Sequence, residues 1–262
     1  MRVDVYLTAA GHTPSRKKAQ DLIDAGAVKI DGVTVKKASS PINEAVPHEV
    51  EIEQVFKYVS RGGMKLEAAL DAFRISVNRK KAVDVGASTG GFTDCLLQRG
   101  AKKVYSIDAG VGQLHESLRE DRRVRCIEQF NARNLTEKTT EGLCDIAVTD
   151  VSFISQTYLI PQIASVLKSG GEFVSLIKPQ FEAGKSALGK GGVVHNGAYR
   201  FLAVKRVLEC GALNGLDCVG VIPSPIEGGD GNKEYLAYFI KRTAIAPSPA
   251  IDDALLRRIT AR

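Results

Sequence analysis

The chain has 262 residues, of which 44% are apolar and 25% are charged, and these proportions are ordinary for a globular protein of one or two domains. Its net charge of +6 favours a polyanionic partner only weakly. No apolar run approaches the ~20 residues that a membrane-spanning helix needs, and no signal-peptide pattern opens the sequence. We therefore expect a soluble, cytoplasmic protein without a membrane partner.

The spacing of the cysteines argues against a metal site. The five cysteines lie far apart, and none of them forms a Cys-x-x-Cys pair or a cluster with a histidine. This pattern is typical of free thiols in a reducing compartment. We predict no bound metal, and a monomer is the working assumption.

The first 54 residues are predicted to form a small α+β unit. A short helix should end at Gly11, and a second helix should begin after Pro14, because proline is favoured near helix starts. Residues 28–35 alternate in polarity around an Asp-Gly turn, which is a strong hairpin signal. Residues 49–52 should add one more strand.

This segment resembles an S4-type RNA-binding domain. The resemblance rests on Ser15-Arg16-Lys17-Lys18-Ala19, the Leu22-Ile23 pair, Gly26 and the Val28-Lys29-Ile30-Asp31-Gly32 hairpin. It implies RNA contacts through basic side chains, which suit phosphate groups. The residues expected there are Arg16, Lys17, Lys18, Lys29, Lys36 and Lys37. A solvated charged surface is the alternative.

Residues 55–63 are expected to link this unit to a larger domain. Gly62 and Gly63 allow a sharp turn before a helix over residues 64–73. Arg61 belongs to a basic stretch there and is a candidate RNA contact. The larger domain is predicted over residues 64–246, followed by a tail over residues 247–262 whose amphipathic helix most simply packs on the surface.

From residue 80 onward, short apolar runs alternate with helical stretches, which predicts a parallel sheet with helices on both faces. The expected strands are residues 82–85, 103–107, 124–127, 145–149, 172–177, 217–222 and 235–241, and the expected helices are residues 90–99, 155–167 and 198–210. No helix separates the last two strands, so the last one should run antiparallel. The predicted fold class is α/β, a Rossmann-like doubly wound domain of the methyltransferase type, preceded by the α+β unit.

A glycine-rich turn follows the first strand of the larger domain, in Asp84-x-Gly86-x-x-x-Gly90-Gly91. Glycines let a ligand approach the backbone, and the next helix offers unpaired N–H groups. The pattern is neither the dinucleotide signature nor a phosphate-binding loop, and an acid beside the turn suits a cationic amino-acid group. It resembles motif I of S-adenosylmethionine-dependent methyltransferases. The resemblance implies this cofactor and contacts from Asp84, Gly86, Ala87, Ser88, Thr89, Gly90, Gly91 and Phe92.

Further cofactor contacts are expected where the next strands end. Asp108 ends the second strand, where a carboxylate can accept hydrogen bonds from both hydroxyls of a ribose, although it could instead cap a helix. Gln129, Phe130 and Asn131 follow the third strand, where related enzymes contact adenine. Asn131 is almost as well suited to cap the next helix. Asp150 ends the fourth strand and should face the same crevice.

Two lysines and two acids stand near the ends of strands. Asp150 and Lys178 end the fourth and fifth strands, and such ends meet at one edge of a parallel sheet. Lys178 follows an apolar run, and buried lysines are rare unless paired. With Lys65 and Glu234, these residues resemble the Lys-Asp-Lys-Glu tetrad of FtsJ-like RNA 2′-O-methyltransferases. Together with the S4-like unit, nearly the whole chain resembles the TlyA family, whose members are also called hemolysins.

The resemblance implies 2′-O-methylation of a ribose, in particular a cytidine ribose, in ribosomal RNA of ribosomal subunits. A ribose hydroxyl is a poor nucleophile that must be aligned with the methyl group and lose a proton. We predict that Lys178 orients and deprotonates this hydroxyl, that Asp150 holds the lysine between cycles, and that Lys65 and Glu234 position the ribose. Which lysine is the base stays open at this point.

Two other functions are weighed against this one. An RNA-binding assembly factor with a silent catalytic centre is disfavoured because no tetrad position is missing. A membrane-lytic protein is disfavoured because the sequence has no spanning segment and no strongly amphipathic basic helix.

Residues 180–194 are rich in glycine and carry Lys185 and Lys190 directly after the fifth strand. We predict that they form a mobile rim that contacts RNA or covers the cofactor. An ordinary connection is the alternative.

Overall fold

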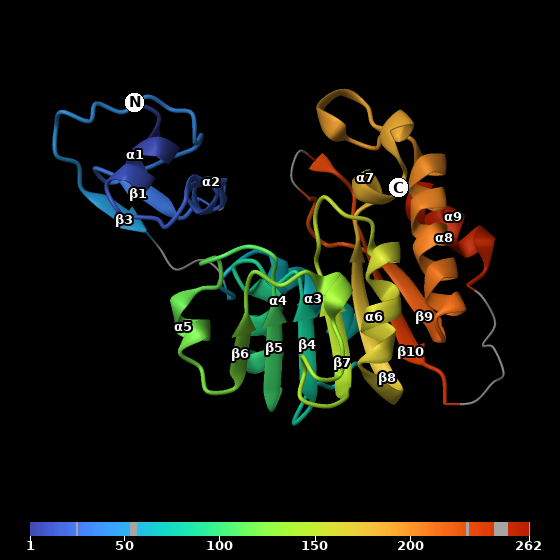
Figure 1. The fold of residues 1–262 in the computed structure, drawn as a ribbon. Coiled ribbons are helices and arrows are strands. Elements are labelled where there is room, and N and C mark those ends of the chain that lie inside the picture. The colour runs from blue at the N-terminus through green and yellow to red at the C-terminus, as the bar shows by residue number, and fades with distance from the viewer. Residues whose placement is uncertain (25, 53–56, 229–230, 244–250, 262) are drawn as a thin grey trace. The chain divides into compact units, whose positions relative to one another are not determined.

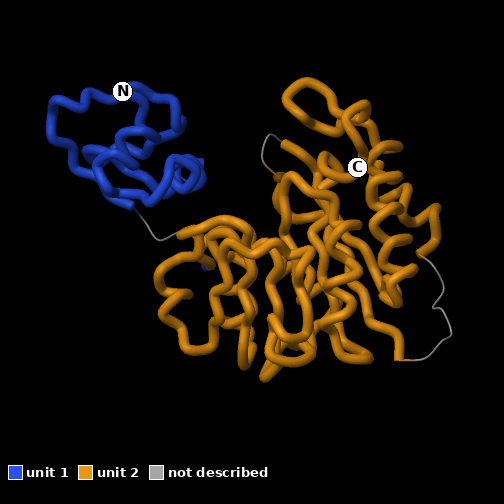
Figure 2. The backbone as a smooth tube through the Cα atoms, in the orientation of Figure 1, with its two compact units in different colours: residues 1–57 blue, residues 58–262 orange. Residues whose placement is uncertain are grey.

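The computed structural model describes residues 1–24, 26–52, 57–228, 231–243 and 251–261. The chain divides into two compact units, residues 1–57 and residues 58–262 (Figure 2). This division falls inside the stretch that the sequence predicts as a linker, residues 55–63. Residues 55 and 56 of that stretch lie outside the described residues.

The first unit packs two helices against a three-stranded antiparallel sheet in the order β2-β1-β3. Its elements are α1 (Val3–Ala9), α2 (Arg16–Asp24), β1 (Val28–Ile30), β2 (Val33–Thr34) and β3 (Val50–Ile52). Asp31 and Gly32 both have positive φ, 52° and 75°, as the predicted two-residue hairpin turn requires. Val3, Leu7 and Val28 lie in a small apolar core between helices and sheet.

The second unit is built on a seven-stranded sheet in the order β6-β5-β4-β7-β8-β10-β9 (Figure 1). The strands are β4 (Lys81–Val85), β5 (Lys103–Ile107), β6 (Val124–Ile127), β7 (Cys144–Thr149), β8 (Leu167–Ile177), β9 (Leu216–Pro223) and β10 (Tyr235–Lys241). Strands β4 to β8 are parallel, whereas β10 is antiparallel to both of its neighbours. The expected α/β fold with an antiparallel last strand is confirmed.

Helices cover both faces of this sheet and bury two separate apolar cores (Figure 1). One core includes side chains of α3 (Gly62–Ala72), α4 (Gly91–Gln98) and α5 (Glu116–Arg119), and the other includes side chains of α6 (Ile160–Ser165), α8 (Gly197–Leu213) and α9 (Asp253–Ala261). Within the described ranges, no helix is both long and apolar enough to cross a bilayer.

Two helices differ from the sequence-based expectation, whereas the helix of the tail forms as expected. Helix α3 begins at Gly62, so both glycines expected to precede it lie in its first turn. The helix expected over residues 155–167 is divided into the short helix η2 (Gln156–Tyr158) and α6. Helix α6 ends at Ser165, because Leu167 already pairs with Cys144 as the start of β8. Helix α9 of the tail packs its buried Leu256 into the core that also contains Phe201 of α8.

Candidate active site

Four charged residues form two ion pairs at the carboxyl edge of the sheet. Lys178 Nζ lies 2.6 Å from Asp150 Oδ1 and donates a hydrogen bond to Ser152 Oγ at 2.9 Å. Lys65 Nζ lies 2.5 Å from Glu234 Oε2, and only 10% and 2% of these two side chains are exposed. Each lysine thus has a carboxylate partner that offsets the cost of removing its charge from water.

Backbone geometry brings the two pairs to the same place. Tyr235 of β10 is paired with Ile177 of β8, which sets Glu234 across from Lys178. A Cβ built on Gly62 would lie 3.7 Å from Asp150 Oδ2, so the first turn of α3, which leads to Lys65, adjoins Asp150. The four residues that the sequence suggested as a tetrad therefore surround one position, although they come from four distant parts of the chain.

The Glu234 carboxylate is also confined by the backbone before it. A Cβ built on Gly228 would collide with Glu234 Oε1. Gly228 donates its N–H to the carbonyl oxygen of Asn232 at 2.8 Å. Gly228 thus limits where the Glu234 side chain can lie, and this close approach is possible only because residue 228 has no side chain.

A cavity of about 730 Å³ opens at the carboxyl ends of β4, β5 and β7. This size lies within the ~300–1,000 Å³ range of small-molecule sites. Half of the twelve residues expected at the cofactor line it, namely Gly86, Ser88, Asp108, Gln129, Asn131 and Asp150. Phe130, which the sequence also placed where related enzymes contact adenine, lines the cavity too. The sequence analysis missed other lining residues, namely Ile107, Ala109, Gln113, Ala132, Val151, Ser152, Phe153, Ile154 and Leu159.

The other six expected residues, Asp84, Ala87, Thr89, Gly90, Gly91 and Phe92, do not line this cavity. Gly90 has φ +99°, and a Cβ there would collide with the Leu114 and Leu118 side chains. A Cβ on Gly91 would collide with Ser60 Oγ. These glycines therefore let the start of α4 pack closely against its neighbours, and Phe92 is a core residue.

Asp84 is fully buried beneath the glycine turn. Its Oδ2 accepts a hydrogen bond from Thr93 Oγ1 at 2.7 Å, whereas its Oδ1 has no hydrogen-bond partner. Burial raises the pKa of Asp84 to about 7, and the nearby carboxylates of Asp150 and Asp108 raise it further against the effect of the Thr93 hydrogen bonds. The predicted acid thus lies behind the loop and can act on a cavity ligand through its charge.

Asp108 and Asn131 hold the cavity wall by accepting backbone hydrogen bonds. Asp108 accepts from the N–H groups of Ser88 and Gly110, both at 2.7 Å. Asn131 Oδ1 accepts from the N–H of Arg133 at 3.0 Å and so caps the short helix η1 (Ala132–Asn134). The capping role weighed for Asn131 is therefore present in the structure, while the residue also lines the cavity.

Phe153 stands out beside the ion pairs. Its side chain is 93% exposed, and its φ of +65° is uncommon for a residue with a bulky side chain. Its ring centroid lies 5.2 Å from that of Phe181, which belongs to the short helix α7 (Pro179–Glu182). The exposed apolar ring and the strained backbone both cost free energy. Because the ring lies beside the segments that carry Asp150 and Lys178, it is a candidate contact for a flat ligand.

The basic residues expected to bind RNA on the first unit lie on α2, on β1 and after β2. Arg16 and Lys17 of α2 are exposed, but Arg16 also donates to Asp4 Oδ2 at 3.2 Å and Lys17 lies 3.3 Å from Asp21. Lys36 and Lys37 are exposed after the hairpin. Neighbouring residues of a strand point to opposite faces. Lys29 therefore points away from the core that its neighbour Val28 shares with α2.

Acidic residues near α2 affect the ionisation of its basic side chains. Burial lowers the pKa of Lys18, and the charge of Asp21 opposes this effect. Asp4 is buried, which raises its pKa, but hydrogen bonds from Arg2, Gln20 and Arg16 outweigh burial and lower it. Asp4 is therefore ionised and accepts a hydrogen bond from Arg16.

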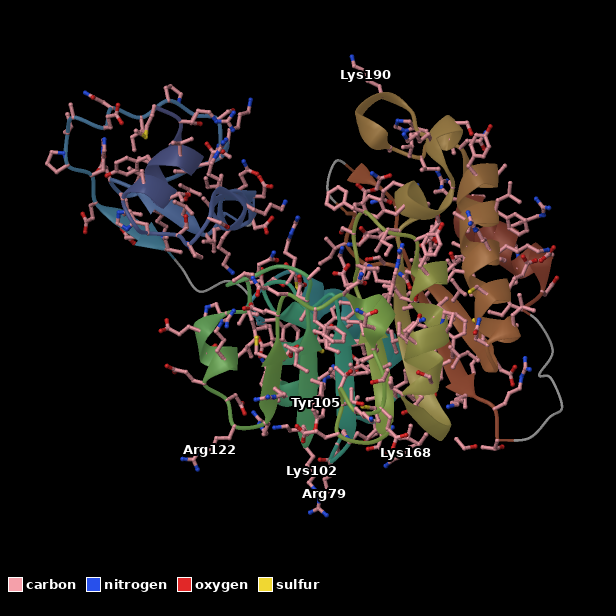
Figure 3. All side chains as sticks on the ribbon, in the orientation of Figure 1. Arg79, Lys102, Tyr105, Arg122, Lys168 and Lys190 are labelled. Carbon is pink, nitrogen blue, oxygen red and sulfur yellow. The ribbon has the colours of Figure 1, made fainter. Side chains whose placement is uncertain are left out.

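Three candidate RNA contacts lie on the second unit. Arg61 stands directly before α3. Lys185 and Lys190 are exposed in the short helices η3 (Lys185–Ala187) and η4 (Lys190–Gly192), and Lys190 projects outward from its loop (Figure 3). The segment is partly anchored, because Val194 donates its N–H to Asn232 Oδ1 at 3.1 Å.

Known proteins match both units. A family model described as an FtsJ-like methyltransferase matches residues 58–241, and one described as an S4 domain matches residues 1–45. Hemolysin A of Brachyspira hyodysenteriae is 45% identical over 92% of this chain and 100% of its own length. The 16S/23S rRNA (cytidine-2′-O)-methyltransferase TlyA of Mycobacterium tuberculosis is 41% identical over 99% of this chain and 97% of its own length. A solved structure of a hemolysin-named protein from Streptococcus thermophilus, 39% identical, superposes with a TM-score of 0.80 over 100% of this chain and 94% of its own.

Proposed function

This chain belongs to the TlyA family of S4-domain, FtsJ-like methyltransferases, and on that basis we propose that it methylates the 2′-hydroxyl of a cytidine ribose in ribosomal RNA. The observation that carries the proposal is the meeting of the Lys178–Asp150 and Lys65–Glu234 pairs at the carboxyl edge of the sheet. The relative from Mycobacterium tuberculosis bears this activity in its name. Such a substrate would place the protein with ribosomes in the cytoplasm.

The cavity beside the ion pairs fits S-adenosylmethionine by size and by charge. Asp108 and Asp150 line it, and the unpartnered Oδ1 of Asp84 lies behind the glycine turn. Three carboxylates around one cavity favour a cationic ligand over a pyrophosphate. When bound, the cofactor would supply a methyl group on a positively charged sulfur. The protein must then hold the ribose hydroxyl in line and accept its proton.

We assign the proton transfer to Lys178. Its Nζ already has two polar partners, Asp150 and Ser152, so the ammonium formed after proton uptake has a carboxylate to stabilise it. Lys65 and Glu234, which form the more buried pair, are proposed to position the ribose.

Phe153 supplies a surface for the target base. Proteins that modify or read single nucleotides in RNA commonly stack unpaired bases on exposed aromatic rings. The Phe153 ring is exposed and lies near the Phe181 ring, and both are a few residues from the proposed catalytic pair. Phosphate contacts are proposed for the basic residues of the first unit and for Arg61, Lys185 and Lys190.

The test is a methyl-transfer assay on unmethylated small and large ribosomal subunits with methyl-labelled S-adenosylmethionine. Wild-type protein should place label in RNA that resists alkaline cleavage at the modified ribose. Lys178→Ala should reduce the rate on the order of 10²-fold or more, because general-base catalysis typically supplies 10²–10⁴-fold. Lys168→Ala is the matched control, since Lys168 is an exposed lysine on the same strand, near its amino end.

Two outcomes would contradict the proposal. Label on no ribosomal RNA, with cofactor binding intact, would favour an RNA-binding assembly factor with a silent centre. Equal labelling by wild type and Lys178→Ala would remove Lys178 from the chemistry.

A further inference from the structure

Glu182 is a buried carboxylate that the proposed chemistry does not use. It lies in α7, four residues after Lys178, and only 3% of it is exposed. Its two oxygens accept hydrogen bonds from Ser155 Oγ at 2.5 Å and from the N–H of Gln156 at 2.8 Å. Both donors belong to the segment that follows Asp150, so Glu182 joins the chain after β8 to the chain after β7.

Gln156 makes the reciprocal connection. It is 2% exposed, and its Nε2 donates to the carbonyl oxygen of Leu176 at 2.6 Å, two residues before Lys178. Its Oε1 accepts a hydrogen bond from Ser175 Oγ. The segment after β7 is therefore tied to β8 before Lys178 through Gln156 and to α7 after Lys178 through Glu182.

The two segments joined in this way carry the parts of the site that must face each other. Asp150 and Phe153 lie on the segment after β7, whereas Lys178 and Phe181 lie on the segment after β8. The ion pair and the ring pair each have one member on either side. A shift between the segments by one methylene length would disturb both pairs together.

We propose that Gln156 and Glu182 are positioning residues that fix these two segments relative to each other, so that Lys178 stays beside Asp150 and Phe153 beside Phe181 during methyl transfer. This role rests on the proposed function. It requires the length of Glu182 and one polar atom at each of its two contacts, with Ser155 Oγ and with the Gln156 N–H, and it does not require the negative charge.

The proposed role of Glu182 does not depend on its negative charge. Burying a carboxylate costs stability. Burial accordingly raises the pKa of Glu182, against the hydrogen bonds from Ser155 and Gln156 and the charge of Arg206, which lower it. Glutamine at 182 keeps the length, its amide oxygen can accept from the Gln156 N–H, and its amide N–H can donate to Ser155 Oγ.

The experiment compares Glu182→Gln with Glu182→Asp in the ribosomal methyl-transfer assay. We expect Glu182→Gln to keep kcat within about threefold of wild type and to melt at the same temperature or higher. Glu182→Asp is one methylene shorter and cannot reach both donors, so its kcat should fall by about tenfold or more at temperatures far below its melting point. The same two substitutions at Glu209, an exposed residue of α8, are the controls and should leave kcat unchanged.

A spectroscopic readout follows the segment itself. The chain has no tryptophan, so Phe153→Trp places a single indole fluorophore on the segment after β7. In that background, Glu182→Asp should lower the steady-state anisotropy of the indole and increase its quenching by acrylamide, whereas Glu182→Gln should change neither. A residue that affects only global stability would leave this signal unchanged below the melting transition.

Several results would overturn the proposal. Loss of activity in Glu182→Gln with activity kept in Glu182→Asp would show that the charge matters and the length does not. A parallel fall of kcat and melting temperature in both variants, with unchanged anisotropy of the indole, would show a structural role only. If the wild type methylates no ribosomal RNA, the proposed function fails by itself, and the anisotropy comparison still tests the connection between the segments.

Discussion

The two edges of the large sheet carry charge in opposite ways. At the amino ends of the strands, Arg79, Lys102, Arg122 and Lys168 project from the domain into solvent (Figure 3). At the carboxyl ends, two lysines are withdrawn from water and each is held by a carboxylate. Both edges are rich in cations, yet only one of them has the arrangement of a reaction site.

The difference lies in solvation. An exposed lysine keeps its water and interacts weakly with its neighbours, and an exposed ion pair is worth only ~0–1 kcal/mol. A lysine in a largely buried pair has exchanged water for fixed protein groups, which are the groups that can orient a substrate hydroxyl. Net charge and its distribution along the sequence therefore say little about where the chemistry is, whereas the burial of individual cations says much more.

Among substitutions that replace no charged residue, Gly228→Ala should disturb the ion pairs at the carboxyl edge most strongly. The new methyl group would collide with Glu234 Oε1 and push this carboxylate away from Lys65. We expect kcat to fall by about ten- to a hundredfold, because small misplacements in a reaction site cost on the order of 10²-fold. Affinity for S-adenosylmethionine, measured by calorimetry, should stay unchanged, since neither residue lines the cavity.

A double variant provides the control for this collision. Glu234→Asp shortens the acid and leaves room for a methyl group. Gly228→Ala should therefore lower kcat much less in the Glu234→Asp background than in wild type. An equal fall of kcat in the two backgrounds would show that Gly228→Ala does not act through the collision with Glu234.

The buried acid of the carboxyl edge should also make stability and binding depend on pH. Because the folded pKa of Asp84, about 7, lies above its ordinary value of 3.8, the folded state holds more protons between these values. The contribution of Asp84 to the free energy of unfolding is therefore greatest at low pH and falls by up to ~1.4 kcal/mol per pH unit as pH rises towards 7. Asp84→Asn should flatten this part of the pH profile in urea denaturation.

Cofactor binding gives the second readout for Asp84. A cationic ligand favours the ionised acid, so binding near pH 6 should release protons, which calorimetry in two buffers of different ionisation enthalpy measures. Asp84→Asn should release fewer protons than wild type. The same proton release in both proteins would mean that Asp84 does not sense the ligand.

The contrast between the edges also shows how far the sequence could predict this site. Asp150 and Lys178 were identifiable because they end apolar strands, and the topology of parallel strands then brings such ends together. Lys65 and Glu234 were identifiable only through resemblance to a tetrad, since neither ends a strand. The packing of Gly90 and Gly91 against Leu114, Leu118 and Ser60 could not be predicted, because it depends on contacts between distant parts of the chain.

Other features had no signal in the sequence. Helix α7 is four residues long, too short to show a helical period, and so the burial of Glu182 could not be foreseen. The positive φ of Phe153 arises from the path of the segment after β7, and nothing in the residue type indicates it.

Substitutions at the amino edge should have the smallest effect on stability and methylation. They test most directly whether the two edges of the sheet differ in function. Lys102 and Arg122 are exposed there, and Lys102→Gln/Arg122→Gln should change the melting temperature little, since surface substitutions usually stay within ~0.5 kcal/mol. The methylation rate should stay within about twofold of wild type. The slope of log affinity for ribosomal RNA against log salt should also be unchanged.

Lys36→Gln/Lys37→Gln removes the same charge from the first unit, where we propose that lysines bind phosphate groups. This variant should reduce the salt slope by ~1 for each lysine that binds a phosphate in the wild type. A reduced slope in Lys102→Gln/Arg122→Gln as well would mean that RNA reaches the amino edge too. The two edges would then differ in chemistry alone, because both would bind RNA.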